Sequence, residues 1–503
     1  MSLPALKNSI TQNGREIISV DQMRAIDARS AELGVPTIDL MENAGAAVAE
    51  QIFARFSKRP TAVLCGPGDN GGDGFVVARR LKKLGWPVWV ETLADPRALR
   101  RDAAEMANRW GGDTLRVSEE NPMAELFVDA MFGAGLTRPL EGEAARLART
   151  LARTPERVVA VDTPSGLHGD MGRPLGEACM RAALTVTFIR KKPAHVLQPG
   201  RSYCGEVVVA DIGSPALALT EQDIRLWEND PHVWGGDFPW PKLDAHKHQR
   251  GHAMIVSGPS GQTGAARLAA RGALRSGAGL VTVLTPPNAL VEHAAQLNAI
   301  MLKPFGADAE LVQAAAKAGA VVIGPAAGVD AGTRNRVAAL AKGAAKLVLD
   351  ADALSVFADK PRDLFALVRE DDVLTPHVGE FQRLFPDIVL PEGRIEGART
   401  AAARAKCVVL LKGPDTIIAA PDGRAAVNAT GTPFLATAGS GDVLAGIVAG
   451  LAAQGMSGFD AACAGAWLHG RAGERAGPGL IAEDLPEALP SVLDALWRGP
   501  NLV

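Results

Sequence analysis

Short runs of apolar and β-branched residues alternate with longer stretches of helical spacing, and this alternation constrains the fold more than any other feature. A typical helical stretch is "FVVARRLKKLG", which directly follows Gly74. Continuous apolar strands that alternate with helices are typical of a parallel sheet covered on both faces, with ligands bound beyond the carboxyl ends of the strands. In the first half we predict strands at residues 61–65, 87–91, 126–130, 157–162, 184–189 and 206–211.

The second half repeats this alternation with its own strands, which we predict at residues 253–257, 280–284, 320–324, 346–350 and 407–411. "TIIAA" and "RAAVN" flank "PDG", a turn suited to a hairpin, so this half also contains an antiparallel element. The periodicity lapses between residues 213 and 251, where prolines, tryptophans and charges gather. A chain of 503 residues exceeds what one core usually serves. We therefore predict two α/β domains: a Rossmann-like three-layer α/β/α sandwich over 1–215, a linker over 216–245, and a second α/β domain over 246–503.

Composition narrows the possible partners. The chain is 47% hydrophobic and 22% charged with a net charge of -3, so no basic excess points to nucleic acid. No apolar run approaches the roughly 20 residues that a membrane helix needs. The five cysteines form no CxxC pair, which argues against a zinc site and a disulfide framework, and the N-terminus lacks the features of a signal peptide. We expect a cytoplasmic homo-oligomer that acts on small molecules.

A glycine-rich loop, "CGPGDNGGDG" at residues 65–74, directly follows the first predicted strand. Five glycines allow a sharp turn and a close approach to a ligand, and the N–H groups could hold a pyrophosphate. The loop is neither a GxGxxG nor a GxxxxGK[ST] motif. The alternative is a glycine-rich surface turn.

Polar side chains follow other predicted strands of the first half. Asn70, Asp129 and Ser165 offer amide, carboxylate and hydroxyl oxygens, which hard cations prefer. Each alone is more typical of a helix cap or a turn. Together they predict a cation site at one edge of the sheet.

The motifs "LMENAG", "GPGDNGGDG", "VDAMFGAGLTRP", "VDTPSGL" and "KKPAH…PGRSYCGEVVVADIG" resemble the NAD(P)H-hydrate epimerase domain over about residues 10–215. That family interconverts the R and S epimers of NADHX or NADPHX, the hydrated forms of the reduced nicotinamide cofactors. The resemblance implies that Asn70, Asp129 and Ser165 ligate K⁺ and that Asp162 faces the nicotinamide ring. Asp69 stands where the family usually has asparagine. The resemblance further implies substrate contacts at Asp69, Asn70, Gly71, Gly72, Asp73, Gly133, Ala134, Gly135, Leu136, Thr137, Arg138 and Pro139.

Epimerisation at the hydrated carbon requires proton transfer, whether the ring opens reversibly or water leaves and returns. A carboxylate and an amine are suitable proton carriers. We assign this role to Asp162 and Lys192 as a hypothesis. The alternative for Lys192 is a solvated surface lysine.

The stretch "ATAGSGDVLAG", residues 436–446, combines a glycine loop, an apolar helix and a carboxylate. Amides of Gly439, Ser440 and Gly441 can offset charge on a phosphoryl group in transfer. Asp442 can then accept the proton of the attacking hydroxyl. The alternative is an N-cap aspartate without chemistry.

This combination resembles the ribokinase-like superfamily and, more narrowly, the ADP-dependent NAD(P)H-hydrate dehydratase, from about residue 228 to the end. The supporting motifs are "KHQRGHAMIVSG", "TGAARLAARGALRSGAGLVTV", "DADAL", "LTPHVGEFQRL", "LLKGPDTII" and "NATGTPFLATAGSGDVLAGIVAG". The resemblance implies phosphorylation of the hydrate by ADP, followed by loss of phosphate, which yields NADH or NADPH and AMP, with Mg²⁺ as charge neutraliser. Implied nucleotide contacts are Lys412, Gly413, Pro414, Asp415, Thr416 and Gly441, and implied hydrate contacts are Ala265, Gly328, His377 and Asp442.

Two departures and three alternatives accompany this interpretation. "GPAAG", which ends at Gly328, lacks the glycine and leucine usual in the family, and Ser440 replaces a threonine. His377 has a buried structural histidine as its alternative. The alternative for the C-terminal half is a vitamin or sugar kinase, in which case the first half would be a non-catalytic Rossmann-like binding domain fused to it. Scaffold relatives of the first domain occur in mRNA-decapping enhancers, but the retained glycine loop, Asp129 and Asp162 favour an enzyme.

Overall fold

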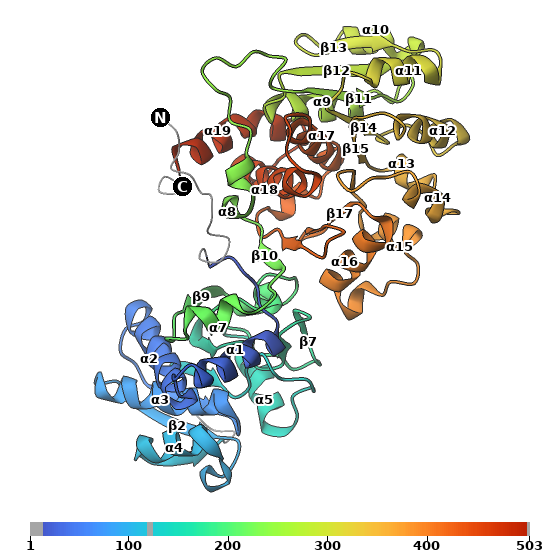
Figure 1. Ribbon diagram of the computed structural model, residues 1–503. Helices are drawn as coiled ribbons and strands as arrows, with labels where there is room; N and C mark the ends of the chain where they lie inside the picture. Colours follow the sequence, from blue (N-terminus) through green and yellow to red (C-terminus); the bar gives the residue numbers. More distant parts are fainter. Residues whose placement is uncertain (1–13, 118–123, 500–503) are drawn as a thin grey trace. The chain divides into compact units, whose positions relative to one another are not determined.

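The computed structural model describes residues 14–117 and 124–499, which form two compact units, Gly14–Ile224 and Arg225 onward (Figure 1). The boundary lies inside the 216–245 segment that the sequence marks as a linker. Helix α7 (Ala216–Thr220) belongs to the N-terminal unit, whereas β10 (Leu226–Glu228) belongs to the C-terminal unit because it pairs with β19 (Ala425–Val427). The segment is therefore divided between the two units and carries its own secondary structure.

The N-terminal unit contains a parallel sheet with the strand order β3-β2-β1-β4-β5-β8-β9. Its six sequence-predicted strands are confirmed, and β3 is an additional edge strand. A separate two-stranded hairpin consists of β6 (Leu167–His168) and β7 (Arg173–Pro174). The sheet strands are β1 (Thr61–Cys65), β2 (Val88–Thr92), β3 (Thr114–Arg116), β4 (Leu126–Ala130), β5 (Val158–Val161), β8 (Leu184–Phe188) and β9 (Glu206–Ala210).

Alternate residues of each strand pack into different cores, because successive side chains of a strand point to opposite faces. Val63 and Val128 pack with apolar residues of α1 to α4, whereas Ala62 and Phe127 pack with apolar residues of α5. Two buried faces make three layers, so the predicted α/β/α sandwich is confirmed. The helices are α1 (Val20–Glu32), α2 (Thr37–Arg55), α3 (Asp69–Lys83), α4 (Arg101–Trp110), α5 (Gly142–Leu151) and α6 (Arg201–Cys204).

The C-terminal unit contains a larger mixed sheet with the order β10-β19-β18-β17-β16-β15-β14-β11-β12-β13. Strands β17, β18 and β19 pair antiparallel, which confirms the predicted hairpin around "PDG", and the other pairs are parallel. The further strands are β11 (His252–Val256), β12 (Leu280–Thr285), β13 (Met301–Pro304), β14 (Ala320–Ile323), β15 (Lys346–Leu349), β16 (Val373–Leu374), β17 (Val408–Leu411) and β18 (Ile417–Ala419).

Helices cover both faces of this sheet. One face packs against α9 (Gly264–Arg275), α17 (Ser440–Ala453), α18 (Gly458–Ala476) and α19 (Asp484–Arg498) in one large core. Helix α16 (Arg394–Ala405) contacts β17 and β18, and its buried alanines lie outside that core. The remaining long or site-bearing helices are α11 (Asp308–Ala315), α12 (Ala331–Leu340), α13 (Asp352–Ser355), α14 (Pro361–Phe365) and α15 (Val378–Leu384).

Helices α9 and α17 pack closely because glycine lines their contact. A Cβ placed on Gly446 would lie 1.9 Å from the Ala269 carbonyl oxygen, so only glycine permits this approach. The contact fixes α17, whose amino end carries the "GSGD" motif. No helix in the described part of the chain is long and apolar enough to span a bilayer.

Candidate active sites

The glycine-rich loop of the N-terminal unit connects β1 to α3, as the sequence predicts. A Cβ on Gly66 would lie 1.7 Å from the Met131 carbonyl oxygen, so the loop after β1 presses directly on the loop after β4. Helix α3 begins at Asp69, immediately after Gly68. The close approach brings polar residues from the ends of two neighbouring strands to one place.

The three predicted cation ligands lie at this edge. Asp129 and Ser165 are fully buried, with Ser165 Oγ donating to Asp129 Oδ1 at 2.6 Å and Ser165 N donating to Oδ2 at 2.7 Å. Burial raises the pKa of Asp129 to about 6, partly offset by the Ser165 hydrogen bonds. The buried Asn70 Nδ2 has no hydrogen-bond partner within the described chain. A buried carboxylate is a group that a bound cation would stabilise, whereas the unpartnered Asn70 Nδ2 is a hydrogen-bond donor that would need an acceptor.

Asp162 and Lys192 form a buried ion pair beside this cluster. Asp162 follows β5 in a left-handed conformation (φ 63°), and its Oδ1 lies 2.9 Å from Lys192 Nζ. The Lys192 side chain is only 1% exposed, so the surface-lysine alternative is wrong. Burial by itself raises the pKa of Asp162, but Lys192 and the Ala134 N–H more than offset it, and the pKa lies below its ordinary value. Asp162 is therefore ionised.

A buried histidine that the sequence did not single out, His195, contacts the backbone of both residues of this pair. His195 Nδ1 accepts from Lys192 N at 2.9 Å, and Nε2 lies 2.9 Å from the Asp162 carbonyl oxygen. Because a carbonyl only accepts, Nε2 must carry the proton. Burial, reinforced by Lys192, lowers the pKa of His195 to about 4, so the ring is neutral. The signal was present in "KKPAH", which places His195 three residues after Lys192.

Asp27 of α1 is a second group that the sequence did not reveal. Val20 and Arg24 lie against the Gly135 position, and Asp27 follows them at helical spacing on the same face. Burial raises the pKa of Asp27 to about 6, partly offset by Lys192 and increased further by Asp162. No local pattern could have found it, because the contact joins α1 to residues more than a hundred positions away.

The predicted substrate-binding residues of this unit divide into two groups. Gly133 lies at the centre, where an added Cβ would be 2.9 Å from Asp162 Oδ2 and 3.1 Å from Asn70 Oδ1. Ala134 N donates to Asp162 Oδ2 at 2.8 Å. Gly71, Gly72 and Asp73 are buried within α3, and burial raises the pKa of Asp73 well above its ordinary value. Asp69, Gly135, Thr137, Arg138 and Pro139 are exposed around this centre, and Leu136 is half-buried.

In the C-terminal unit, the "GSGD" loop leads directly into α17. Gly439 has φ 86°, which favours glycine, and the helix begins at Ser440. Asp442 is the third residue of the helix, and the N-cap position belongs to Gly439, so the N-cap alternative for Asp442 is wrong. Burial raises the pKa of Asp442 to about 6, Asp350 adds to this, and Lys412 opposes it.

Lys412 points at this loop and is paired with an aspartate that the sequence analysis assigned no role. Its Nζ lies 2.6 Å from Asp350 Oδ1 and 3.5 Å from where a Gly441 Cβ would be. Asp350 is 2% exposed and directly follows β15. The available signal was the "DADAL" motif, whose first residue is Asp350.

The rest of the predicted nucleotide loop, residues 413–416, forms a closed turn. Thr416 Oγ1 donates to the Gly413 carbonyl oxygen at 3.0 Å, and Pro414 is exposed. Asp415 is buried and forms an ion pair with Arg394 of α16. Asp415 therefore anchors the turn from inside, and Arg394, which no local motif marks, becomes part of the site's support.

Ser440 is held by a buried histidine from α18. His469 Nε2 lies 3.0 Å from both the Ser440 hydroxyl and the Ser440 carbonyl oxygen. Burial lowers the pKa of His469 to about 4, so the ring is neutral and donates from Nε2. This contact fixes the first residue of α17 and with it the glycine loop.

The other predicted hydrate-contacting residues lie on two loops and in the first turn of a helix. His377 caps α15, with Nδ1 accepting from Gly379 N at 2.9 Å, and its side chain is 54% exposed, so the buried-histidine alternative is wrong. His377 also bridges to Lys412 through the backbone. Gly328 has φ 86° and donates its N–H to Asp352 Oδ2 at 2.9 Å. Ala265 lies in the first turn of α9.

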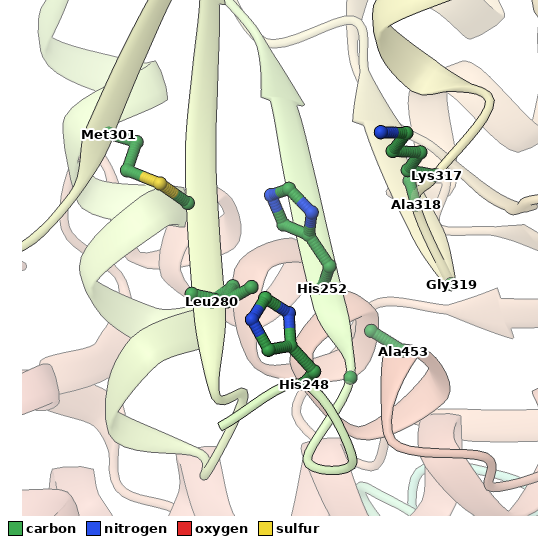
Figure 2. Close-up of a pocket in the computed structure, with 9 residues that line it drawn as sticks. His248, His252, Leu280, Met301, Lys317, Ala318, Gly319 and Ala453 are labelled. Carbon is green, nitrogen blue, oxygen red and sulfur yellow. The ribbon is translucent and has the colours of Figure 1, made fainter. Parts of the chain in front are cut away.

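A cavity of about 530 Å³ lies elsewhere in the C-terminal unit (Figure 2). His248, His252 and Lys317 line it, together with the beginnings of β11, β12 and β13. Asp350 and Lys412 follow the carboxyl ends of β15 and β17, whereas the cavity lies at the amino ends of its strands. The cavity is therefore separate from the "GSGD" loop, whose Gly441 lies beside Lys412.

The fold and the two sites define a two-domain α/β enzyme, with an ion-paired carboxylate in one unit and a glycine anion loop beside a carboxylate in the other. The NAD(P)H-hydrate dehydratase family model matches residues 253–491, and the model of the YjeF-related protein N-terminus matches residues 37–194. A bifunctional NAD(P)H-hydrate repair enzyme of Moorella thermoacetica is 38% identical, over 95% of this chain and 96% of its own length. One of Thermofilum pendens is 35% identical, over 96% and 97%. The chain belongs to the family of bifunctional NAD(P)H-hydrate repair enzymes.

Among solved structures, an ADP/ATP-dependent NAD(P)H-hydrate dehydratase from Bacillus subtilis, co-crystallised with ATP and Mg²⁺, is similar to the C-terminal part. It is 28% identical with a TM-score of 0.46, and the match covers 54% of this chain and 99% of that chain.

Proposed function

We propose that this enzyme repairs hydrated nicotinamide cofactors in two steps. The N-terminal unit interconverts R- and S-NAD(P)HX, and the C-terminal unit dehydrates the S epimer with ADP, which yields NAD(P)H, AMP and phosphate. The observation that carries the proposal is a half-buried carboxylate, Asp442, beside the glycine loop and Lys412. Membership of the repair-enzyme family indicates that NAD(P)HX is the substrate.

In the N-terminal unit, Asp162 would carry the proton that epimerisation moves. Its carboxylate is ionised, and its orientation is set by Lys192 Nζ, the Ala134 N–H and the Thr187 hydroxyl. Lys192 is the paired amine that can return a proton. Asp27, with a pKa near 6, is protonated in a larger fraction of molecules than an ordinary aspartate at neutral pH. Groups whose pKa values are pushed apart by their environment are typical of acid–base sites.

A potassium ion would fit the buried oxygens of this unit. Asp129, Ser165 and Asn70 present carboxylate, hydroxyl and amide oxygens, and the Phe132 carbonyl oxygen lies 3.2 Å from Ser165 Oγ. A bound monovalent cation would neutralise the buried Asp129 carboxylate. It would also hold Asn70 near Asp162, because both border Gly133. These residues bind and orient the substrate rather than transfer protons.

In the C-terminal unit, Asp442 would accept the proton of the hydrate's hydroxyl as that oxygen attacks the β-phosphorus of ADP. The bond from the β-phosphorus to the bridging oxygen breaks, and AMP leaves. Amides of Gly439, Ser440 and Gly441 at the start of α17 and the Lys412 ammonium offset the developing charge. The phosphorylated carbon then loses phosphate and the neighbouring ring carbon loses a proton, which restores the double bond.

The nucleotide would bind along residues 412–416 and the hydrate among Ala265, Gly328, His377 and Asp442. No group of three or more acidic, histidine or cysteine side chains in the described chain is arranged to hold a metal. Mg²⁺ would therefore be held mainly by phosphate oxygens and water, as this ion usually is with nucleotides. When bound, it neutralises phosphate charge.

The test uses a mixture of R- and S-NADHX with ADP, Mg²⁺ and K⁺, followed by the absorbance of reduced nicotinamide. The full-length parent should convert both epimers. Asp162→Asn should convert the S fraction at the parent's rate and leave the R fraction, whereas Asp442→Asn should convert neither but still equilibrate the epimers. Asp113→Asn, an exposed carboxylate of the N-terminal unit, is the matched control. Unchanged conversion by both active-site variants would overturn the proposal. A homo-oligomer and a cytoplasmic location stay predictions.

A further inference from the structure

A sharp corner joins β15 to α13, with Asp350 and Asp352 on either side of Ala351. Ala351 has φ 49°, a conformation that non-glycine residues rarely adopt. The loop after β14 presses against this corner, since a Cβ on Gly324 would lie 1.8 Å from the Asp350 carbonyl oxygen. Strain of this kind persists where surrounding structure enforces it, and it gathers at functional sites.

The two carboxylates of the corner serve two different loops. Asp350 Oδ1 lies 2.6 Å from Nζ of Lys412, which heads the proposed nucleotide loop. Asp352 Oδ2 accepts from the N–H of Gly328, on the proposed hydrate side, at 2.9 Å. Because one residue separates them, any movement of the corner displaces both loops.

Asp350 also influences the proposed base electrostatically. The charged groups that face Asp442 are Asp350, at the end of β15, and Lys412, at the end of β17. His469 of α18, which holds Ser440, is neutral and adds no charge. A negative charge near a carboxylate disfavours its ionised form, so Asp350 makes Asp442 a stronger base than an ordinary aspartate.

We propose that the Asp350–Asp352 corner positions both substrates of the dehydratase, with Asp350 holding the Lys412 ammonium at Gly441 and Asp352 holding the Gly328 loop. This inference rests on the proposed function. Lysine carries its ammonium on a flexible four-carbon chain, so without a fixed partner the ammonium of Lys412 would sample many positions. Asp350 removes that freedom before ADP arrives. Pre-organisation of this kind lowers the cost of reaching the reactive geometry.

The test compares Asp350→Asn with Asp352→Ala in the full-length protein. Asp350→Asn keeps the shape and removes the charge. A hydrogen bond that loses its charge assistance weakens enough to raise the KM for ADP about 10-fold. The acidic limb of the kcat profile should also move to lower pH, because the charge that opposes ionisation of Asp442 is gone. Asp352→Ala should raise the KM for NADHX and leave that limb in place.

Three further measurements keep the outcomes separate. Matching thermal transitions of parent and variants exclude misfolding, and the conservative Asp350→Glu variant should recover part of the ADP affinity. Calorimetric titration with ADP gives the affinity without any turnover. An Asp350→Asn protein with the parent's ADP affinity and acidic limb would overturn the inference. The inference would also be overturned if Asp350→Asn changed only the Mg²⁺ concentration required for activity, since Asp350 would then be a metal ligand. A parent that fails to convert NADHX with ADP would overturn the proposed function, while the ADP titrations would still decide the role of Asp350.

Discussion

Replacing Lys192 by methionine should destabilise the N-terminal unit strongly. The Lys192 side chain is 1% exposed, that of Asp162 is 17% exposed, and their charged atoms lie 2.9 Å apart. Removing one partner of a buried ion pair leaves an uncompensated charge and costs about 3–5 kcal/mol. At 1.36 kcal/mol per factor of ten, this corresponds to about a 10²·²- to 10³·⁷-fold rise in the population of the state in which this unit is open to hydrogen exchange.

Hydrogen exchange measured by mass spectrometry on the full-length protein is the appropriate assay, because a two-unit chain does not unfold in one step. The amides of β8, Leu184–Phe188, lie next to the ion pair, and their exchange should accelerate by that factor. Asp162→Asn combined with Lys192→Met removes both charges and should recover part of the loss. Lys83→Met, an exposed lysine of α3, should change nothing.

The effect should depend on pH with a definite sign. In the parent, the pKa of Asp162 is depressed, so its stabilising contribution is present above the ordinary value of 3.8 and is lost only as pH falls below it. In Lys192→Met, burial is no longer opposed by the ammonium and the pKa rises, so stability should fall as pH rises through the new value. Parent-like exchange in β8 for Lys192→Met, after correction for intrinsic rates, would refute the reasoning.

Three further predictions follow from the C-terminal unit. Asp442→Asn should lower the dehydration rate about 10²- to 10⁴-fold while epimerisation continues. The parent's kcat should rise through pH about 6 as Asp442 ionises. A kcat that does not change within roughly one pH unit on either side of that pKa would contradict this assignment. Gly446→Ala should destabilise this unit by about 1–3 kcal/mol in thermal denaturation, because the added Cβ would lie 1.9 Å from the Ala269 carbonyl oxygen. The control Gly236→Ala should leave stability unchanged, because a Cβ there meets nothing within 4 Å. Arg394→Met should raise the KM for ADP and lower stability by about 3 kcal/mol, because the buried Asp415 loses its ion pair. Adding Asp415→Asn should restore part of the stability. If the two changes in stability were strictly additive, the ion pair would not be the cause of the effect.

Local patterns located most of the sheet strands and many of the candidate site residues. Periodicity located the six strands of the N-terminal sheet and the hairpin of the C-terminal unit, because burial of a strand or helix is written into consecutive residues. Glycine-rich loops marked Asn70, which follows β1, and Asp442, at the start of α17, because close backbone approach requires a residue without a Cβ. The extra edge strand β3 was missed because it is short and partly exposed, with little apolar signal.

The tertiary structure decided which side chains meet. Strand order, helix docking and loop closure set the contacts of His195 with Asp162, of Asp350 with Lys412 and of Arg394 with Asp415. They also bring Asp27 within the electrostatic influence of Lys192. The contacting residues lie from 21 positions apart (Arg394 and Asp415) to 62 apart (Asp350 and Lys412), and Asp27 lies 165 positions from Lys192, so no local period encodes these arrangements. The same folding set the protonation states, because burial and neighbouring charge, which shift a pKa, exist only once distant segments pack together. By itself the sequence determined the two α/β halves and the candidate residues. Only packing made Asp162 an ionised partner of Lys192 and raised the pKa of Asp442 to about 6, because both effects need burial and charges from distant segments.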